Sequence, residues 1–363
     1  MLMQDTSNTS LAVYSDIKRE VWQPHKDPGA NEWWYFDAMS DDGSEAIVIV
    51  FFEDLVFSPR YKHVTQIFNE SVTSAASDSA NPLPAVSLLY FRDEKPVYRL
   101  LNEYEGTKFS YDQAERWYCV GKSRFRFDSA AYGSGFAISL DLPLGRGRRV
   151  EAHFEWLSIE ADLLASPSNG RYLHEMNLAV PRADVTGRIS VLDRAGSAKD
   201  VRHFRGTGYH DHELDDRWLA NMVEFRHRGK AHFADRTVIF CVHSEFDSDV
   251  TAADLFVIED NKMQRLRVLS IDQKFGRNKF GVKYPQSLKM TAADGTRLDV
   301  KPRRIIDSGF YYLRFLSGLT LTAPDGSVRD GNGITEFVAP KALKNRWLGW
   351  ISDMRLRKNN RES

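Results

Sequence analysis

The chain has 363 residues, which is longer than one ordinary domain and predicts two domains, each able to bury a core without disulfide or metal staples. The formal net charge is −1, which gives no electrostatic support for nucleic-acid binding, because that function calls for a basic domain or stripe. Aromatic residues make up 12% of the chain and favour β structure and sites that hold unsaturated ligands against rings.

The N-terminal segment shows no targeting or membrane signal. The first ten residues are polar after Met3, without the apolar stretch of a secretory signal. The longest apolar run, Ala46 to Phe52, is far too short for a membrane span and predicts a buried strand. We therefore expect a cytoplasmic protein.

Most of the chain has the pattern of short antiparallel strands. Apolar residues alternate with smaller or polar ones over residues 136–142, 150–156 and 185–191, which is typical of strands with one face in a core. Asp-Gly pairs at 42–43, 294–295 and 325–326 separate apolar runs, as in tight hairpins. The pattern predicts an all-β sandwich or barrel.

Three segments depart from this pattern. Residues 71–84 are rich in Ser, Ala and Pro and predict a loop over a barrel mouth. Residues 165–171, ASPSNGR, predict a domain boundary, giving domains 1–170 and 171–363. Residues 340–357 carry apolar side chains at three- and four-residue steps and predict a C-terminal amphipathic helix. We expect this helix to dock across a barrel, although its Trp and basic residues also suit peripheral contact with a membrane.

The densest group of ionisable residues is GTGYHDHE, residues 206–213. In an extended strand Tyr209, Asp211 and Glu213 share one face, whereas His210 and His212 share the other. Burying this run without partners is costly, and its glycines indicate close backbone approach, so we favour a functional site over a solvated loop. Two imidazoles on one face could bind Zn or Fe, but the other ligand motifs of such a site are missing, and we expect no metal.

Two further segments contribute candidate residues. In NEWWYFD, residues 31–37, we expect most rings in the core. Glu32 lies beside Trp33, and we expect the ring to desolvate the charged form of the carboxyl group, which would raise the pKa of Glu32 and suit it as a proton donor. The segment HEMN, residues 174–177, offers acid–base and hydrogen-bonding groups. The predicted substrate-binding residues are Glu32, Trp33, Trp34, His174, Asn177, His210 and Glu213.

Several common enzyme motifs are missing from the sequence. It contains no GxGxxG opening a helix, no GxxxxGK[ST], no GxSxG and no HExxH, and its two cysteines form no CxxC. Nucleotide cofactors and a serine-hydrolase mechanism therefore lose most of their support. The remaining possibilities are cofactor-free proton transfer in a shaped pocket, or plain binding of a small molecule.

The order of several segments resembles one family. EWWYFDA, PRADVTGRISV, GTGYHDHE and GITEFVAP, followed by a basic MRLRK, are similar to the lipocalin-like hydroxyneurosporene synthase or carotenoid 1,2-hydratase group, which includes AttH-type proteins. Lipocalin-like Diels–Alderases are more distant relatives. The resemblance runs from about Trp22 to Arg357 and implies two lipocalin-like antiparallel β-barrels in tandem, with a ligand between or within them.

The resemblance also implies roles for two residues. Asp211 corresponds to the proton donor to an alkene, and Tyr209 to its aromatic, hydrogen-bonding neighbour. Two departures weaken the case for a carotenoid substrate: Glu213 stands where the family commonly has Asn, and residues 174–182 lack the family's tryptophan. Trp33, Trp34 or Trp218 could replace that tryptophan in space, so Trp218 joins the predicted substrate-binding residues.

Three functions remain open. The first is a lyase or cyclase in which Asp211 protonates a C=C bond of an apolar terpenoid- or polyketide-like molecule, followed by hydration or ring closure. The second is a pericyclase that folds a polyene into a reactive shape. The third is a carrier that holds a hydrophobic small molecule without chemistry. We favour an enzyme, because a carrier has little use for the ionisable YHDHE segment in its wall.

Overall fold

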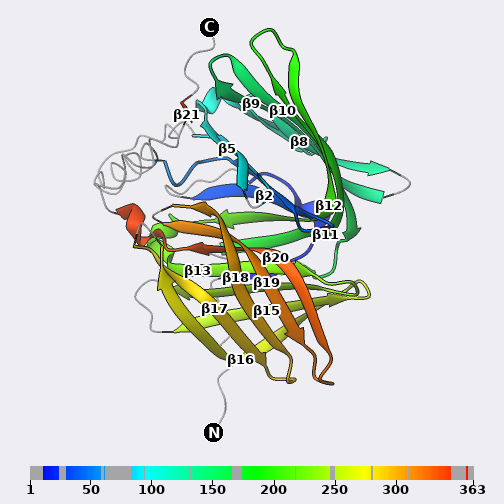
Figure 1. Cartoon of the computed structure of the whole chain (residues 1–363), viewed down its shortest axis with the longest axis vertical. Helices are drawn as coiled ribbons and strands as arrows, with labels where there is room; N and C mark the ends of the chain where they lie inside the picture. The colour runs from blue at the N-terminus through cyan, green and yellow to red at the C-terminus, as the bar shows by residue number, and fades with distance from the viewer. Residues whose placement is uncertain are drawn as a thin grey trace.

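The computed structural model describes residues 11–23, 30–58, 61, 83–93, 95–130, 133–165, 174–216, 218–245, 250–278, 281–309, 311–344 and 357–358. Within these residues the structure is almost entirely antiparallel β, as the sequence predicted. It consists of an open, curved sheet followed by a closed barrel (Figure 1). The helical elements are short: η1 (Ile17–Arg19), η2 (Gly106–Lys108), α2 (Leu219–Met222) and η3 (Pro340–Lys344).

The open sheet has the strand order β21-β5-β4-β3-β2-β12-β11-β10-β9-β8-β7-β6, and β1 pairs in parallel with β11. Its strands are β1 (Leu11–Tyr14), β2 (Asn31–Ser40), β3 (Glu45–Phe52), β4 (Ala85–Arg92), β5 (Lys95–Glu103), β6 (Phe109–Asp112), β7 (Trp117–Val120), β8 (Ser123–Ala130), β9 (Gly133–Gly145), β10 (Arg148–Glu160), β11 (His174–Leu192), β12 (Ala198–Asp215) and β21 (Arg357–Lys358).

The barrel is an up-and-down barrel of eight strands, closed by pairing between its first and last strands, as in lipocalins. Its strands are β13 (Val223–His232), β14 (Thr237–Glu245), β15 (Thr251–Glu259), β16 (Lys262–Arg277), β17 (Lys283–Ala292), β18 (Arg297–Ser308), β19 (Tyr312–Thr322) and β20 (Val328–Val338). The second predicted barrel is thus present. The first differs from the prediction, because its sheet has two separate ends, β21 and β6, among the described strands.

The expected division at residue 170 falls inside the open sheet. Strands β11 and β12 pair with β10 on one side and β2 on the other, so they belong to the first unit, and the barrel begins only at Val223. Residues 165–171, the predicted boundary, lie in the connection between β10 and β11. Most of that segment lies outside the described residues, as do residues 71–82 of the predicted loop and residues 345–356 of the predicted C-terminal helix.

The three predicted Asp-Gly turns are confirmed. They join β2 to β3, β17 to β18 and β19 to β20. Gly43, Gly295 and Gly326 have φ angles of 72°, 94° and 84°, a left-handed conformation that glycine adopts without a Cβ penalty. These turns fix the register of the hairpins that flank them.

Three apolar layers hold the molecule together. One lies inside the curve of the open sheet, one between the sheet and the outer surface of the barrel, and one inside the barrel. Strand β3 is buried on both faces, with Ile49 in the first layer and Val50 in the second, which explains its unbroken apolar sequence. The barrel interior is filled by side chains such as Phe240 and Leu298, so the barrel is a packed core.

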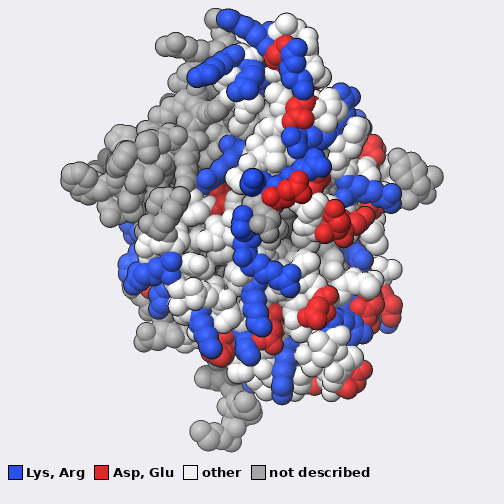
Figure 2. Space-filling view, in the orientation of Figure 1, with Lys and Arg blue, Asp and Glu red and all other residues white. Residues whose placement is uncertain are grey.

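The outer surface of the barrel carries charges of both signs. Figure 2 shows Lys and Arg side chains over much of one face, with Asp and Glu among them. Exposed basic residues of β18, including Arg297, Lys301 and Arg304, contribute to this surface. None of the helices in the described part of the chain has the length and apolar character needed to cross a bilayer.

Candidate functional site

Strands β2 and β12 present a regular row of rings and carboxylates to the barrel. Their antiparallel register places one ring opposite one carboxylate three times in succession. The pairs are Tyr209 with Asp37, Tyr35 with Asp211, and Trp33 with Glu213. All six residues are buried. Their strands, β2 and β12, lie where the sheet meets the barrel strands β13 and β20 (Figure 1).

The barrel strand β13 supplies one cation to each of these pairs. Arg226, Arg228 and Lys230 alternate with His227 and Gly229, so the three cations share the outer face of the barrel. Each cation contacts the carboxylate of one pair and lies over its ring, at 4.1 Å for Lys230 and Tyr209, 4.9 Å for Arg228 and Tyr35, and 5.9 Å for Arg226 and Trp33. We call these three ring–carboxylate–cation groups the interface ladder.

The first group of the ladder pairs Lys230 with Asp37. The ammonium contacts Asp37 Oδ2, which also accepts a hydrogen bond of 2.8 Å from the Tyr35 hydroxyl. Burial lowers the pKa of Lys230 and raises the pKa of Asp37, although each opposes the shift of the other. Desolvation therefore pushes both groups toward their neutral forms.

The second group contains Asp211. Arg228 Nη1 donates to Asp211 Oδ2 at 3.2 Å, and the same guanidinium donates twice at 3.1 Å to Glu336 Oε2 on β20. The surroundings of Asp211 are thus more polar than the apolar pocket expected from the sequence. Burial and then the charge of Asp211 raise the pKa of Tyr209 well above its usual range, so this phenol remains a proton-bearing neighbour.

The third group contains Glu213, whose Oε2 accepts a hydrogen bond of 2.7 Å from Arg226 Nη1. The same Nη1 lies 3.0 Å from His174 Nε2, and His174 Nδ1 contacts Asp215. Two of the predicted residues, His174 and Glu213, are therefore linked through Arg226, because β11 and β12 are neighbouring strands. The register places His174 opposite Asp215, four residues along β12 from Asp211.

A cavity of about 90 Å³ adjoins the ladder. It is lined mainly by rings and aliphatic side chains, including Trp33, Phe52, Phe57 and Tyr311, while Arg228 and Glu336 form a polar wall. Small-molecule sites usually have a lining of this kind, mostly apolar with a few convergent polar groups.

The other predicted residues of β2 and β12 lie on the opposite face of the sheet. His212 lies between two carboxylates, with Nδ1 3.4 Å from Glu20 and Nε2 2.5 Å from Glu32, and its ring stacks on Trp34 at 5.0 Å. Although burial alone lowers the pKa of His212, Glu20 and Glu32 raise it to about 10. Because side chains alternate along a strand, Glu32 and Trp34 cannot reach the face of Asp211.

His210 and Asn177 belong to this same opposite face. His210 Nε2 lies 3.2 Å from Glu20 Oε2, and Asn177 Nδ2 donates to Glu20 Oε1 at 2.9 Å. Glu20 thus ties the segment after η1 to the sheet, and His210 and His212 lower its pKa to about 2 despite its burial. Across the described ranges no set of three or more His, Cys, Asp or Glu side chains is arranged to hold a metal ion.

The raised pKa of His212 predicts a pH-dependent stability. The imidazolium contributes stability below its ordinary pKa of 6.5, and this contribution is lost as pH rises through about 10. The wild-type protein should therefore lose more free energy of unfolding between pH 7 and pH 10 than a His212→Gln variant, as measured by urea denaturation at each pH. His203→Gln, at an exposed position of the same strand, should keep the wild-type slope, and equal slopes for all three proteins would contradict this assignment.

The last predicted residue, Trp218, lies apart from the ladder. Its indole donates to the Val56 carbonyl at 3.3 Å, and its ring packs against the cluster that contains Leu313 and Phe337. The sequence interpretation missed the cations of β13 and the carboxylates Glu20 and Glu336. A signal for the cations is present, since Arg, Arg and Lys recur at every second residue of EFRHRGK.

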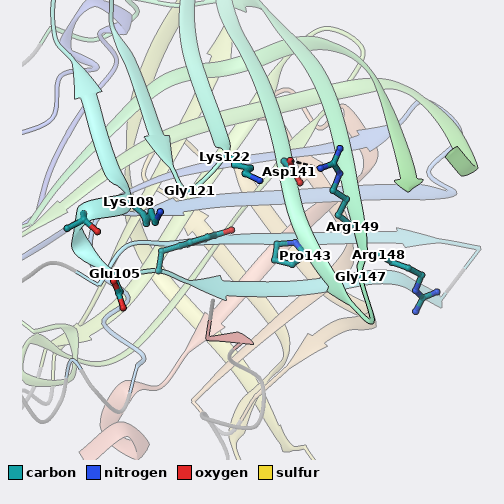
Figure 3. Close-up of a pocket in the computed structure, with 11 residues that line it drawn as sticks. Glu105, Lys108, Gly121, Lys122, Asp141, Pro143, Gly147, Arg148 and Arg149 are labelled. Carbon is teal, nitrogen blue, oxygen red and sulfur yellow. Dashed lines mark ion pairs between the residues drawn. The ribbon is translucent and has the colours of Figure 1, made fainter. Parts of the chain in front are cut away.

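A larger cavity, of about 420 Å³, lies at the loop end of the open sheet. Figure 3 shows its charged lining, with Asp141 and Arg149 paired at 3.7 Å and Lys108 and Lys122 on the adjoining turns. None of the predicted site residues lines it. The ladder and its apolar cavity therefore remain the candidate site.

No family model matches the chain. A curated protein of Chlorobaculum tepidum, hydroxyneurosporene dehydrogenase, is 23% identical over 366 residues, which cover 97% of this chain and 94% of the relative. The sequence similarity thus extends over both the open sheet and the barrel.

Solved structures show the same fold. The crystal structure of CghA with Sch210972 has a TM-score of 0.59 at 13% identity and covers 92% of this chain and 96% of that one. A candidate AttH protein from Nitrosomonas europaea has a TM-score of 0.53 at 15% identity and covers 86% of this chain and 93% of that one. Kievitone hydratase from Nectria haematococca has a TM-score of 0.50 at 8% identity and covers 91% of this chain and 98% of that one. The resemblance of this chain to the lipocalin-like hydroxyneurosporene synthase and AttH-type group is confirmed.

Proposed function

We propose that this protein is a cofactor-free lyase or cyclase that acts on an apolar, unsaturated small molecule held between the open sheet and the barrel. The observation that carries the proposal is a buried ladder, containing Asp211 and Tyr209, whose Arg228 lines an apolar, ring-lined cavity. Asp211 and Tyr209 themselves line a small hollow of about 10 Å³ that shares Arg228 and Glu336 with this cavity. The names of two similar proteins, a hydroxyneurosporene dehydrogenase and a kievitone hydratase, agree with an unsaturated substrate and with hydration.

The proposed reaction begins at Asp211. Among the described residues, Asp37 and Asp211 each make one ion pair, with Lys230 and Arg228, whereas Glu213 and Glu336 each make two or more. Of the two singly paired carboxylates, Asp211 is the one that the resemblance to the hydratase group implies as the acid. We assign to it the acid that gives a proton to one carbon of a C=C bond. The cation at the other carbon faces the rings of Tyr35 and Trp33. Water then forms a C–O bond with the cation and gives one of its protons to a base. Alternatively, an internal double bond attacks the cation and closes a ring, and the new cation is discharged by loss of a proton from a neighbouring carbon.

A pericyclase is the second candidate. The cavity wall of rings could hold a polyene in a folded conformation, and the saving in entropy would then supply the acceleration without a titrating group. A pH-independent rate and full activity of an Asp211→Asn variant would favour this reading. Unchanged ligand recovered by mass spectrometry from the purified protein, with no turnover of any polyene, would instead favour a carrier.

Ligand binding in the cavity can be tested without knowing the substrate. The fluorescent polyene cis-parinaric acid should bind the wild-type protein and gain emission, because it leaves water for an apolar site. Leu101→Trp, which fills the cavity from β5, should weaken this binding at least about tenfold, since it removes the space that the polyene occupies. Leu269→Trp, at an exposed position on the barrel, is the matched control and should bind normally. Equal binding by both variants would place the ligand elsewhere.

A further inference from the structure

The residues next to the ladder contain a second proton-transfer group. His174 begins β11 and Asp215 ends β12, and the antiparallel register places them directly opposite each other. Both side chains are buried, and His174 Nδ1 contacts Asp215 Oδ1. A carboxylate on Nδ1 orients an imidazole and stabilises its protonated form, as in catalytic Asp–His pairs.

The contacts of His174 fix which nitrogen carries the proton. Nε2 lies 3.0 Å from Arg226 Nη1, and a guanidinium can only donate. His174 Nε2 must therefore accept this hydrogen bond, which leaves the proton on Nδ1, where Asp215 accepts it. The imidazole is thus held in the tautomer whose Nε2 lone pair can take up a proton.

The His174–Asp215 pair lines a second hollow. A cavity of about 160 Å³ is lined by His174, Asp215, Arg226 and His243. Arg226 and Leu219 line both this cavity and the ring-lined cavity beside the ladder. The two hollows therefore adjoin, and Arg226 forms part of the wall between them. Water occupies a polar hollow of this size readily, because several polar groups can bind it.

We propose that His174 is the base that takes the proton from the water added to the substrate. This step rests on the proposed function, in which Asp211 has first protonated the double bond. Arg226 keeps its hydrogen bond of 2.7 Å to Glu213 and breaks its hydrogen bond to His174 Nε2. The water oxygen bonds to the carbon cation while one of its protons moves to Nε2, giving an alcohol and an imidazolium. The sum is one water added per double bond, once Asp211 regains a proton and His174 loses one.

The charges around His174 suit this role. Asp215 faces Nδ1, and Glu213 Oε2 lies 3.3 Å from Nε2, so the imidazolium is flanked by two carboxylates. Arg226 opposes it, while His243, whose pKa burial lowers, remains neutral across the cavity. Glu245 lines the same hollow.

The tautomer can be measured without a substrate. Side-chain ¹⁵N NMR of the wild-type protein near pH 7.5 should show His174 as a neutral ring protonated on Nδ1, and Asp215→Asn should disturb that state. A ring protonated on Nε2 in the wild-type protein would overturn the inference, whatever substrate is later found. Circular dichroism of Asp215→Asn would show that the variant is folded.

The catalytic role is tested by measuring the two proton transfers separately. The substrate is neurosporene, the polyene whose hydration gives a hydroxyneurosporene, the compound in the name of the curated relative. In D₂O, His174→Gln should still incorporate deuterium at the alkene, while incorporation of ¹⁸O from labelled water falls at least about 100-fold. Asp211→Asn should lose both labels, and His203→Gln should keep both. Added imidazole should restore ¹⁸O incorporation to His174→Ala, which a merely structural role would not allow.

The possible outcomes separate this inference from the proposed function. Full ¹⁸O incorporation by His174→Gln, with Asp211→Asn inactive, would overturn the role of His174 and leave the proposed function intact. Full activity of Asp211→Asn would overturn the proposed acid itself. If neurosporene is not converted by the wild-type protein, the NMR result decides on the tautomer that the role requires.

Discussion

Asp211→Asn should lower turnover of the alkene by about 10²–10⁴-fold, the usual contribution of a general acid, while the protein remains folded. Asparagine has the shape of aspartate and keeps a carbonyl oxygen for the hydrogen bond from Arg228, but it has no acidic proton to give. Arg228 retains Glu213 and Glu336 as anionic partners, so the buried guanidinium stays compensated. Product formation is followed by mass spectrometry, and folding by circular dichroism and thermal melting.

Asp128→Asn provides the matched control for this experiment. Asp128 lies exposed on β8 and pairs with Arg126 at 3.2 Å at the protein surface. It should leave turnover unchanged, because it removes the same charge far from the cavity. An Asp211→Asn protein that is folded and as active as the control would rule out Asp211 as the acid and direct attention to a pericyclic reaction.

Arg228→Met should destabilise the protein by about 3–5 kcal/mol, the cost of removing one partner from a buried ion pair. Arg228 is only 9% exposed and contacts three carboxylates, Asp211, Glu213 and Glu336, drawn from the sheet and the barrel. Methionine fills a similar volume but leaves these charges poorly compensated in a site of low polarity. The change is measured as a shift in the midpoint of urea denaturation.

A surface pair gives the comparison for Arg228. Arg126→Met should cost at most about 1 kcal/mol, because water already screens exposed ion pairs. If Arg228→Met is no more destabilising than Arg126→Met, the ladder does not connect sheet and barrel as described. Adding Glu213→Gln to Arg228→Met should recover part of the lost stability, since the second change removes one of the stranded charges.

The sequence alone predicted the strands and assigned the side chains of β12 to the correct faces. Alternation placed Tyr209, Asp211 and Glu213 on one side and His210 and His212 on the other, and the structure has the same division. The apolar run of β3 correctly predicted a buried strand, and the structure buries it on both faces. These features depend only on periodicity within one strand, which a sequence displays directly.

Features that depend on contacts between distant strands could not be predicted from the sequence. Whether the first sheet closes depends on which strands lie at its ends, and no local pattern distinguishes β6 from an interior strand. The partners of Asp211 come from β13 and β20, and they meet it only because the outer face of the barrel packs on the sheet. Glu32 and Trp33 are adjacent in sequence yet serve opposite faces, which explains why grouping them in one site was misleading.

The side chains on one face of strand β12 contact cations, and those on its other face contact carboxylates. Its carboxylates meet Arg226 and Arg228, while its imidazoles meet Glu20 and Glu32. A slip of one residue would turn the carboxylates toward those glutamates and the imidazoles toward the arginines, so like charges would meet on both sides at once. Electrostatics therefore makes this alignment of the strand unique, and misaligned pairings are penalised before packing comes into play.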